Sequence, residues 1–482
     1  MPSPAPQPST APIPLPAAPP APQRSSARLV FALATAVLTF SMMQTLLVPA
    51  LPTFIAEFGV DSAVAGWILT SYLLCGAVAA PILGSLGDRH GHRKILLLAF
   101  ALFVAGAVLA AAAWSLPALL VGRVLQGASM AAFPLALAIV RRHTSGAAQR
   151  SAIGWLSGTM GLGAGAALVV GGVIVEGLSW HWLFITGALM GALSLLLISV
   201  WVPASPRGAA APTDWPGTLL LTTGLLALLL GISQGTAWGW GSAAILGLFA
   251  LALAALAALV AVELRTAAPL IDVRTLARPA LAVTNGLTLF LGFIPYLFYV
   301  GLPILLQAPA GAGVGQGFSV TETGIALLPG AVLVFLGGRF APWLIARTGS
   351  RVTALSALAV MALGSAGVAL GPGSLAVVVV FFSLIGLGNG IGFAVVADLV
   401  AGLAPRSEIA AALGVNGVLR TVGSALGTPV STAVLAGAHT GAAGASAAGA
   451  VDAAPFTTLF AIAAAVSVIG ALCSLTLRAP RD

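Results

Sequence analysis

Fourteen long apolar runs restrict the fold of this chain more than any other feature of its sequence. Each run holds about the 20 residues that a helix needs to cross a bilayer. They cover residues 29–49, 64–84, 94–113, 116–140, 152–174, 181–203, 215–236, 241–264, 279–307, 320–345, 351–371, 374–400, 408–436 and 455–477. Because lipid offers the backbone no hydrogen-bond partners, unbroken runs favour helices, whereas a membrane barrel shows shorter alternating segments. The sequence therefore predicts an all-α polytopic membrane protein with 14 transmembrane helices.

The charge content excludes a water-soluble domain. Only 7% of the residues are Asp, Glu, Lys or Arg and 59% are hydrophobic, whereas roughly a quarter of the residues in soluble domains are charged. With a mean hydropathy of +1.08, most of the surface must be solvated by lipid. Cys75 and Cys473 fall inside predicted helices, so no disulfide framework is expected. Residues 1–28 are rich in Pro and Ala and predict a disordered cytoplasmic tail.

The basic residues sort to one side of the predicted helices. Lys and Arg near helix ends favour the cytoplasm. With an even number of crossings, the loops and tails on one side hold 17 of the 20 Lys and Arg residues, and the other three, Arg123, Arg339 and Arg420, lie within helices. We therefore predict a multi-pass protein of the plasma membrane with both termini in the cytoplasm. The excess of basic residues reflects this orientation, and no nucleic-acid partner is expected.

A short internal repeat divides the chain into two similar halves. Residues 84–93, GSLGDRHGHR, and residues 342–351, PWLIARTGSR, each lie between the second and third helix of a six-helix block. The matched pairs are Leu86/Leu344, Arg89/Arg347, Gly91/Gly349 and Arg93/Arg351. The predicted domains are an N-terminal six-helix bundle at 29–206, an inserted helix pair with linkers at 207–278, and a C-terminal six-helix bundle at 279–482. Two like-oriented halves around a midplane site are typical of transporters.

Several motifs resemble those of a known family. GSLGDRHGHRK at 84–94 resembles the G-x-L-x-D-R-x-G-x-[RK] loop of the major facilitator superfamily, and LLVGRVLQG at 119–127 resembles its helix-4 motif. The Gly-rich stretch at 158–174 is similar to the antiporter motif of drug exporters, and the inserted helix pair matches the fourteen-helix drug:proton antiporter family. The resemblance implies a monomeric transporter, and no enzyme, that exchanges a small-molecule substrate for protons. It implies no cofactor and no metal.

The resemblance implies a conformational latch at the first copy of the repeat. Its residues would be Gly84, Asp88, Arg89, Gly91 and Arg93. An acid at this position can meet the N-terminus of a helix, where partial positive charge favours it, and the helix that begins near residue 407 is the candidate. The alternative is a loop whose basic residues only fix the topology, which leaves the acid and the glycines unexplained.

A second implied group, Arg123, Gln126 and Gly127, lies in the helix expected over 116–140 and would have a transport or relay role. A charge at membrane depth costs at least ~2.5–3.5 kcal/mol on insertion scales, so such a residue usually faces a cavity or a partner. The alternative is an arginine that snorkels to the cytoplasmic interface. Arg420 is a second intramembrane arginine with the same two interpretations.

The third group is a glycine face on the helix expected over 152–174. Spacings of four, three and four place its glycines on one side, where small residues allow close helix packing in lipid. The group consists of Gly154, Gly158, Gly161, Gly165, Gly171 and Gly172. The resemblance implies that this face seals part of the route against the helix over 320–345. The family's Pro is absent, since Ala166 and Ala167 stand there.

A carboxylate within the membrane is missing from the predicted route. Met43 stands where many relatives place an Asp, and a desolvated carboxylate can carry protons because burial raises its pKa. All twelve Asp and Glu residues fall in loops, tails or helix ends, so proton coupling is implied by the resemblance alone. The other candidates for the substrate cavity are Gln44, Met42, Phe133, Asn285, Tyr299, Asn389, Asn416 and Arg420.

These observations predict a secondary active transporter that uses the proton gradient to export drugs or other small amphipathic molecules. No Walker-type phosphate loop is present, which argues against direct use of ATP. Two alternatives stay open: a dedicated exporter of one metabolite or antibiotic, and an uncoupled facilitator, which the missing carboxylate favours. A receptor is disfavoured because no extramembrane domain is predicted.

Overall fold

The computed structural model describes residues 23–47, 50–60, 62–204, 214–266, 273–310, 314–405, 409–440 and 453–477. The predicted tail lies largely outside these residues. The described helices are α1 Gln23–Thr45, α2 Leu51–Phe58, α3 Ser62–His90, α4 His92–Ala111, α5 Leu116–Gly127, the 3-10 helix η2 Ala128–Ala131, α6 Ala132–His143, α7 Gly146–Gly177, α8 His181–Trp201, α9 Trp215–Trp238, α10 Ala243–Glu263, α11 Val273–Leu276, α12 Pro279–Gln307, α13 Val320–Leu370, α14 Leu375–Leu403, α15 Ile409–Thr440 and α16 Ala454–Ser474.

The described part of the chain is an all-helical polytopic bundle. Twelve of its helical segments are long and apolar enough to cross a bilayer. One of them, α13, has 51 residues and a non-helical residue, Gly349, in its interior, so it consists of two helical segments at 320–348 and 350–370. The 32-residue α15 is a further long helix outside that set. The number of 14 membrane helices stays a prediction.

The two glycines matched by the internal repeat share a backbone conformation that side chains rarely adopt. Gly91 has a φ of 98° and Gly349 a φ of 80°, and glycine reaches this region without steric cost. Each joins two helices by a single residue. The expected loop at 84–94 is therefore wrong in detail: Gly84 and Asp88 lie in the last two turns of α3, because the chain turns at Gly91 alone.

The span expected as one helix over 116–140 is interrupted. It consists of α5, the 3-10 helix η2 and α6. The hydroxyl of Ser129 donates to the carbonyl of Gln126 at 2.8 Å, within the tightened segment. A 3-10 stretch inside a helix often marks a hinge or local strain, and here it directly follows the motif residues Gln126 and Gly127.

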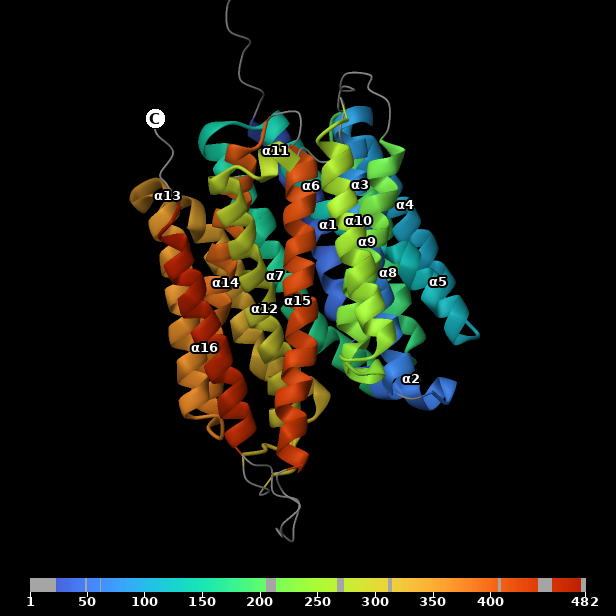
Figure 1. Cartoon of the computed structure of the whole chain (residues 1–482), viewed down its shortest axis with the longest axis vertical. Helices are drawn as coiled ribbons and strands as arrows, with labels where there is room; N and C mark the ends of the chain where they lie inside the picture. The colour runs from blue at the N-terminus through green and yellow to red at the C-terminus, as the bar shows by residue number, and fades with distance from the viewer. Residues whose placement is uncertain are drawn as a thin grey trace, which may run out of the picture.

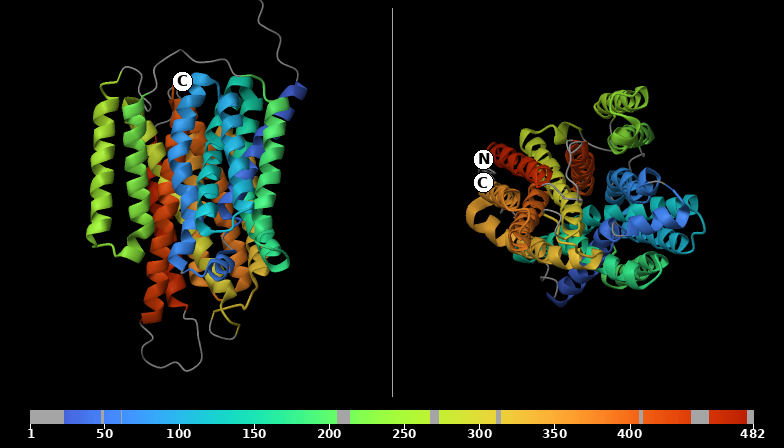
Figure 2. Two further views of the ribbon diagram at one scale, coloured as in Figure 1. Left: turned by 90° about the vertical axis from the view of Figure 1, so that its right-hand side faces the viewer. Right: turned by 90° about the horizontal axis from the view of Figure 1, so that it is seen from below.

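The long helices run side by side, and their connections gather at two ends (Figure 1). We call the upper end of Figure 1, where α3 ends and α4 begins, the basic end, and the lower end, near α2, the far end. Seen from below, the blue-to-cyan helices of the first half and the yellow-to-red helices of the second lie on opposite sides (Figure 2). The pair α9 and α10 stands at the edge, where α9 contacts α3 and α15. The domain boundaries at 206 and 278 stay predictions.

The two halves pack most closely where α7 meets α13. A Cβ atom added to Gly158 would lie 2.5 Å from the carbonyl oxygen of Phe335, and one added to Gly154 would lie 2.8 Å from that of Gly338. A Cβ added to Gly165 would lie only 1.9 Å from the Cβ of Ala331. The glycine face thus has room for hydrogen atoms alone, and the two backbones approach as closely as small-residue faces allow in lipid. We call this contact the glycine seam.

We expect Gly158→Ala to lower the thermal unfolding midpoint of the purified protein and to reduce its transport rate. The added methyl group would collide with a backbone oxygen of α13, which cannot move without displacing the helix, and overpacking of this kind typically costs ~1–3 kcal/mol. Gly247→Ala in α10 is the control, because nothing lies within 4 Å of its added Cβ. Equal midpoints for the two variants would contradict the close contact at the seam.

Candidate functional site

Two neighbouring cavities lie between the halves. The basic-end cavity is lined by residues of α3, α6 and α7 on one side and of α12, α14 and α15 on the other. The middle cavity lies between α1 and α7 on one side and α12, α14 and α15 on the other. Met160, Phe393 and Arg420 line both. The two cavities therefore adjoin each other along the interface of the two halves.

Polar groups of α1 shape one wall of the middle cavity. The hydroxyl of Ser41 donates to the carbonyl of Met160, and that of Thr45 donates to Ala164 O at 2.7 Å, so both are engaged by the backbone of α7. Gln44 instead donates from Nε2 to the hydroxyl of Tyr296 at 3.3 Å. This bond joins α1 of the first half to α12 of the second across the cavity.

A polar cluster on α12 and α15 forms the opposite wall. Nδ2 of Asn416 donates to Oδ1 of Asn285 at 2.9 Å and lies 2.7 Å from the hydroxyl of Thr288. One turn further along α15, the guanidinium of Arg420 lies 5.6 Å from the centre of the Phe393 ring. The wall thus combines amide groups, a cation and an aromatic ring, which suits a ligand with both polar and apolar parts.

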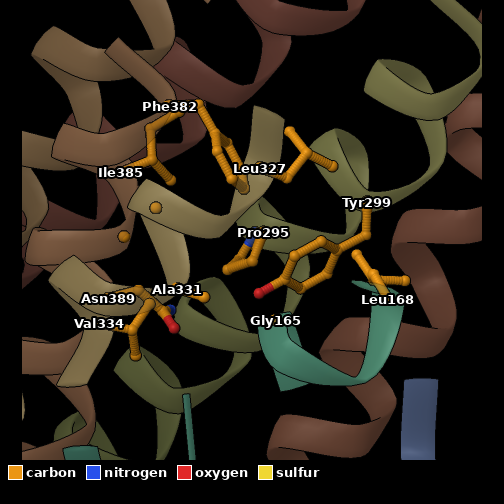
Figure 3. A pocket seen from close by; sticks show the side chains of 12 residues that line it. Gly165, Leu168, Pro295, Tyr299, Leu327, Ala331, Val334, Phe382, Ile385 and Asn389 are labelled. Atoms are coloured by element: carbon orange, nitrogen blue, oxygen red, sulfur yellow. The ribbon is translucent and has the colours of Figure 1, made fainter. Parts of the chain in front are cut away.

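A third, lateral cavity adjoins the middle one and is lined by α7, α12, α13 and α14. The hydroxyl of Tyr299 and the side chain of Asn389 point toward the same space, near Gly165 of the glycine seam (Figure 3). Asn389 also donates from Nδ2 to the carbonyl of Leu291 at 3.0 Å. The lateral cavity therefore brings the glycine seam and two predicted cavity residues together.

Arg123 occupies a sealed site. It is completely buried two turns into α5, close to the far end, so its side chain does not snorkel to the basic end. Its Nε donates to Ile68 O at 2.8 Å and its Nη1 to Gln126 Oε1 at 2.6 Å, while Cζ lies 4.4 Å from the centre of the Tyr72 ring. Nη2 lies 3.5 Å from Met43 O. The positive charge of Arg123 is therefore stabilised by neutral hydrogen-bond acceptors and by the π face of the Tyr72 ring.

The cavities contain most of the predicted substrate residues. Gln44, Phe133, Tyr299, Asn389, Asn416 and Arg420 line at least one of them. Met43, Arg123, Gln126 and Asn285 line none of the three, although Asn285 holds Asn416 in place. Tyr296 and Ser41 also line the middle cavity, but they were not predicted from the sequence. The chain has only three Tyr residues, and two of them, three positions apart on one helix, are a signal that could have identified Tyr296.

The latch residues lie at the basic end. Oδ1 of Asp88, in the last turn of α3, is 2.8 Å from Nε2 of His92, the first residue of α4. Arg93 donates from Nη2 to the carbonyl of Ser199 at 2.6 Å, which ties α4 to α8. The predicted partner near residue 407 lies outside the described residues. The structure therefore shows how the motif closes the turn between α3 and α4, and its role as a latch stays a proposal.

Polar contacts fasten the halves together at both ends. At the basic end, Arg141 of α6 donates to the carbonyl of Ala401 in α14 and lies 3.8 Å from Oδ1 of Asp398. At the far end, Oε2 of Glu176 in α7 accepts from the hydroxyl of Thr321 at 2.6 Å, and Oε1 accepts from its backbone N–H at 3.2 Å. We call these contacts the basic-end clasp and the far-end clasp. The central cavities lie between them.

The comparisons with known proteins agree with this geometry. The family model described as the Major Facilitator Superfamily matches residues 33–428. The chain belongs to the major facilitator superfamily. The solved structure of the proton:xylose symporter XylE of this superfamily superposes with a TM-score of 0.66 over 95% of this chain and 97% of that one. At 14% sequence identity, that similarity shows the fold alone.

Two relatives have a higher sequence identity to this chain than XylE has. An uncharacterized MFS-type transporter of Mycobacterium tuberculosis, Rv1877, is 33% identical over 69% of this chain, and the match spans only about half (48%) of its own length. A tetracenomycin C resistance and export protein of Streptomyces glaucescens is 28% identical over 84% of this chain and 75% of its own length. The chain is therefore a member of this superfamily that has an export protein among its relatives, and it spans about half the length of Rv1877.

We expect Asp88→Asn to reduce efflux several-fold and to leave membrane insertion unchanged. The substitution removes the carboxylate charge beside His92, while the basic residues that set the orientation remain. Initial efflux rates at matched expression measure the effect. His90→Gln is the control, because His90 is exposed in the same turn of α3. Normal efflux by the Asp88→Asn protein would count against the latch.

We expect Arg141→Gln to open the basic end more often, because it removes the donor of the basic-end clasp. A cysteine introduced at Ala397, which lines the basic-end cavity, reports this opening in a background without the two native cysteines. Its reaction with a membrane-impermeant maleimide from the basic side should be several-fold faster. Arg142→Gln, at the exposed neighbouring position, is the control. Equal labelling rates in both variants would show that this clasp does not hold the end closed.

Proposed function

We propose that this protein is a secondary active transporter that exports drugs or other small amphipathic molecules by alternating access. The observation that carries the proposal is the pair of mixed polar and aromatic cavities between two helical halves, with a polar clasp at either end. A site of this kind, near the midplane and between two halves, suits a rocking mechanism. The similarity to an antibiotic export protein supports export as the direction.

In this mechanism the two clasps are released in turn. Opening of the basic end breaks the contacts of Arg141 with Ala401 and Asp398 and admits the substrate. Opening of the far end separates Glu176 from Thr321 and releases it. At the glycine seam, backbone meets backbone at Gly154 and Gly158, and the side chain of Val334 packs directly onto Gly161, so α7 and α13 stay in close contact while the halves rock. The two states then differ mainly by a few exchangeable polar contacts.

Proton coupling is the less supported part of the proposal. Among the described residues, no Asp or Glu lines any of the three cavities described above. Asp398 is the acid best placed to couple, because it takes part in the basic-end clasp with Arg141, and protonation of its carboxylate would weaken the clasp. An uncoupled facilitator is the second candidate function, favoured by the absence of a carboxylate from the cavity walls.

Liposomes that contain the protein test both functions. We expect acidic-inside liposomes to accumulate at least one dye of a panel made of ethidium, a neutral coumarin amide and a coumarin carboxylate, and nigericin, which collapses the pH gradient, to abolish the accumulation. Asp398→Asn should abolish the accumulation that the pH gradient drives, while the dye still equilibrates across the membrane. Accumulation that survives nigericin and follows an imposed membrane potential would replace antiport by facilitated diffusion. If no dye of the panel entered these liposomes faster than it enters protein-free liposomes, the proposed export function would be refuted for this panel.

A further inference from the structure

The middle cavity carries a positive charge that its walls do not neutralise. Arg420 lines both central cavities. Within the described part of the chain, its guanidinium has no carboxylate partner, and the titratable groups that act on it electrostatically are the phenols of Tyr296 on α12 and Tyr72 on α3. Both phenols are neutral at physiological pH, because their ordinary pKa lies near ~10. The cation is therefore balanced by dipoles and by the π face of Phe393 alone.

The backbone holds Arg420 at this wall. A Cβ added to Gly292 of α12 would lie 2.2 Å from the carbonyl oxygen of Arg420, so α12 and α15 touch at this point without a side chain between them. The hydroxyl of Ser424 donates to the same carbonyl at 3.0 Å. The main chain at Arg420 is thereby fixed against α12, and its long side chain lines the cavities rather than the helix interface. These contacts fix the position of the Arg420 main chain in the cavity wall.

The interior as a whole is electropositive. Arg123 is a second interior cation, itself completely buried, and its partners are all neutral. The described acids stay away from the cavities: Asp398 and Glu176 belong to the clasps, and Asp88 contacts His92 at the basic end. In a medium of low dielectric constant, an uncompensated cation attracts an anion strongly and repels a second cation.

We propose that Arg420 makes the middle cavity selective for amphipathic anions that carry a carboxylate or a similar oxyanion. This inference rests on the proposed export function and specifies its substrate class. The anionic group pairs with the guanidinium, which can hold two oxygens side by side. Gln44 from the opposite wall and Tyr296 from the same wall supply further polar contacts. The apolar body packs on Phe393 and Tyr299, which line the same cavity.

Equilibrium binding tests the inference separately from transport. The probes share one fluorescent scaffold: methoxycoumarin carboxylate, its neutral methyl amide and its cationic aminoethyl amide. Fluorescence anisotropy is measured with the purified protein in nanodiscs of neutral lipid. We expect the carboxylate to bind at least about tenfold more tightly than the neutral amide, in line with a charge-assisted hydrogen bond, and the cationic amide to bind most weakly. Equal affinities, tighter binding of the cation, or no saturable binding of the carboxylate would overturn the proposal.

Substitutions assign the preference to one residue. Arg420→Gln should weaken carboxylate binding about tenfold or more and leave the neutral amide unchanged, whereas Arg420→Lys should keep most of the preference for the anion. Arg339→Gln is the matched control, because Arg339 is also predicted to lie within a membrane helix but is exposed and lines none of the cavities. A preference that persists in Arg420→Gln would overturn the assignment. The preference of the wild-type protein for the carboxylate is measured without any substitution, so the anion site remains testable even if a variant fails to fold.

The two proposals fail in different experiments. Selective binding of the carboxylate without movement of any dye in liposomes would sustain the anion site and refute the exporter. Transport of ethidium but not of the carboxylate would sustain the exporter and refute the anion site. Transport of the carboxylate that Arg420→Gln slows about tenfold, with Arg339→Gln unaffected, would support both.

Discussion

The structure depends on one constraint, which is that lipid cannot hydrogen-bond to the polar groups it surrounds. Helices meet this constraint for the backbone, and the polar side chains within them must find partners inside the protein. Thr39 illustrates the simplest solution, a bond from its hydroxyl to the carbonyl of Thr35, one turn earlier. Arg123 needs more and uses two backbone carbonyls, the amide of Gln126 and the ring of Tyr72.

The same constraint explains why glycines line the contact between the two halves. Without a hydrophobic driving force between helices in lipid, close association depends on van der Waals contact and small residues. The seam of α7 and α13 brings backbone against backbone at Gly154 and Gly158, and the side chain of Val334 packs onto Gly161. Polar contacts between the halves occur at Arg141 and at Glu176, near opposite ends. A close seam of small residues, and breakable bonds at the ends, together suit two halves that rock.

The general fold could be predicted from the sequence, because apolar length and the placement of basic residues are local properties. Gly91 and Gly349 were matched by a short repeat, and both prove to turn the chain at positive φ. The extent of α3 and α4 was not predicted, because a single glycine replaced the expected loop. The cavity was predicted only in part. Gln44 and Asn416 lie in its walls, whereas Arg123 is sealed by carbonyls of other helices, and partners of that kind leave no pattern in a sequence.

The charge of the cavity bears on how transport is driven. An exporter of cations must move charge against an interior-negative membrane potential, and a carboxylate that exchanges its proton is the usual means of compensation. An anion moves outward down that potential, which supplies ~2.3 kcal/mol per charge at 100 mV, or roughly a 50-fold concentration ratio. If Arg420 selects monovalent anions, export needs no carboxylate in the cavity. The Met at position 43, where many relatives are expected to have an Asp, and the unneutralised Arg420 would then be two consequences of a single adaptation.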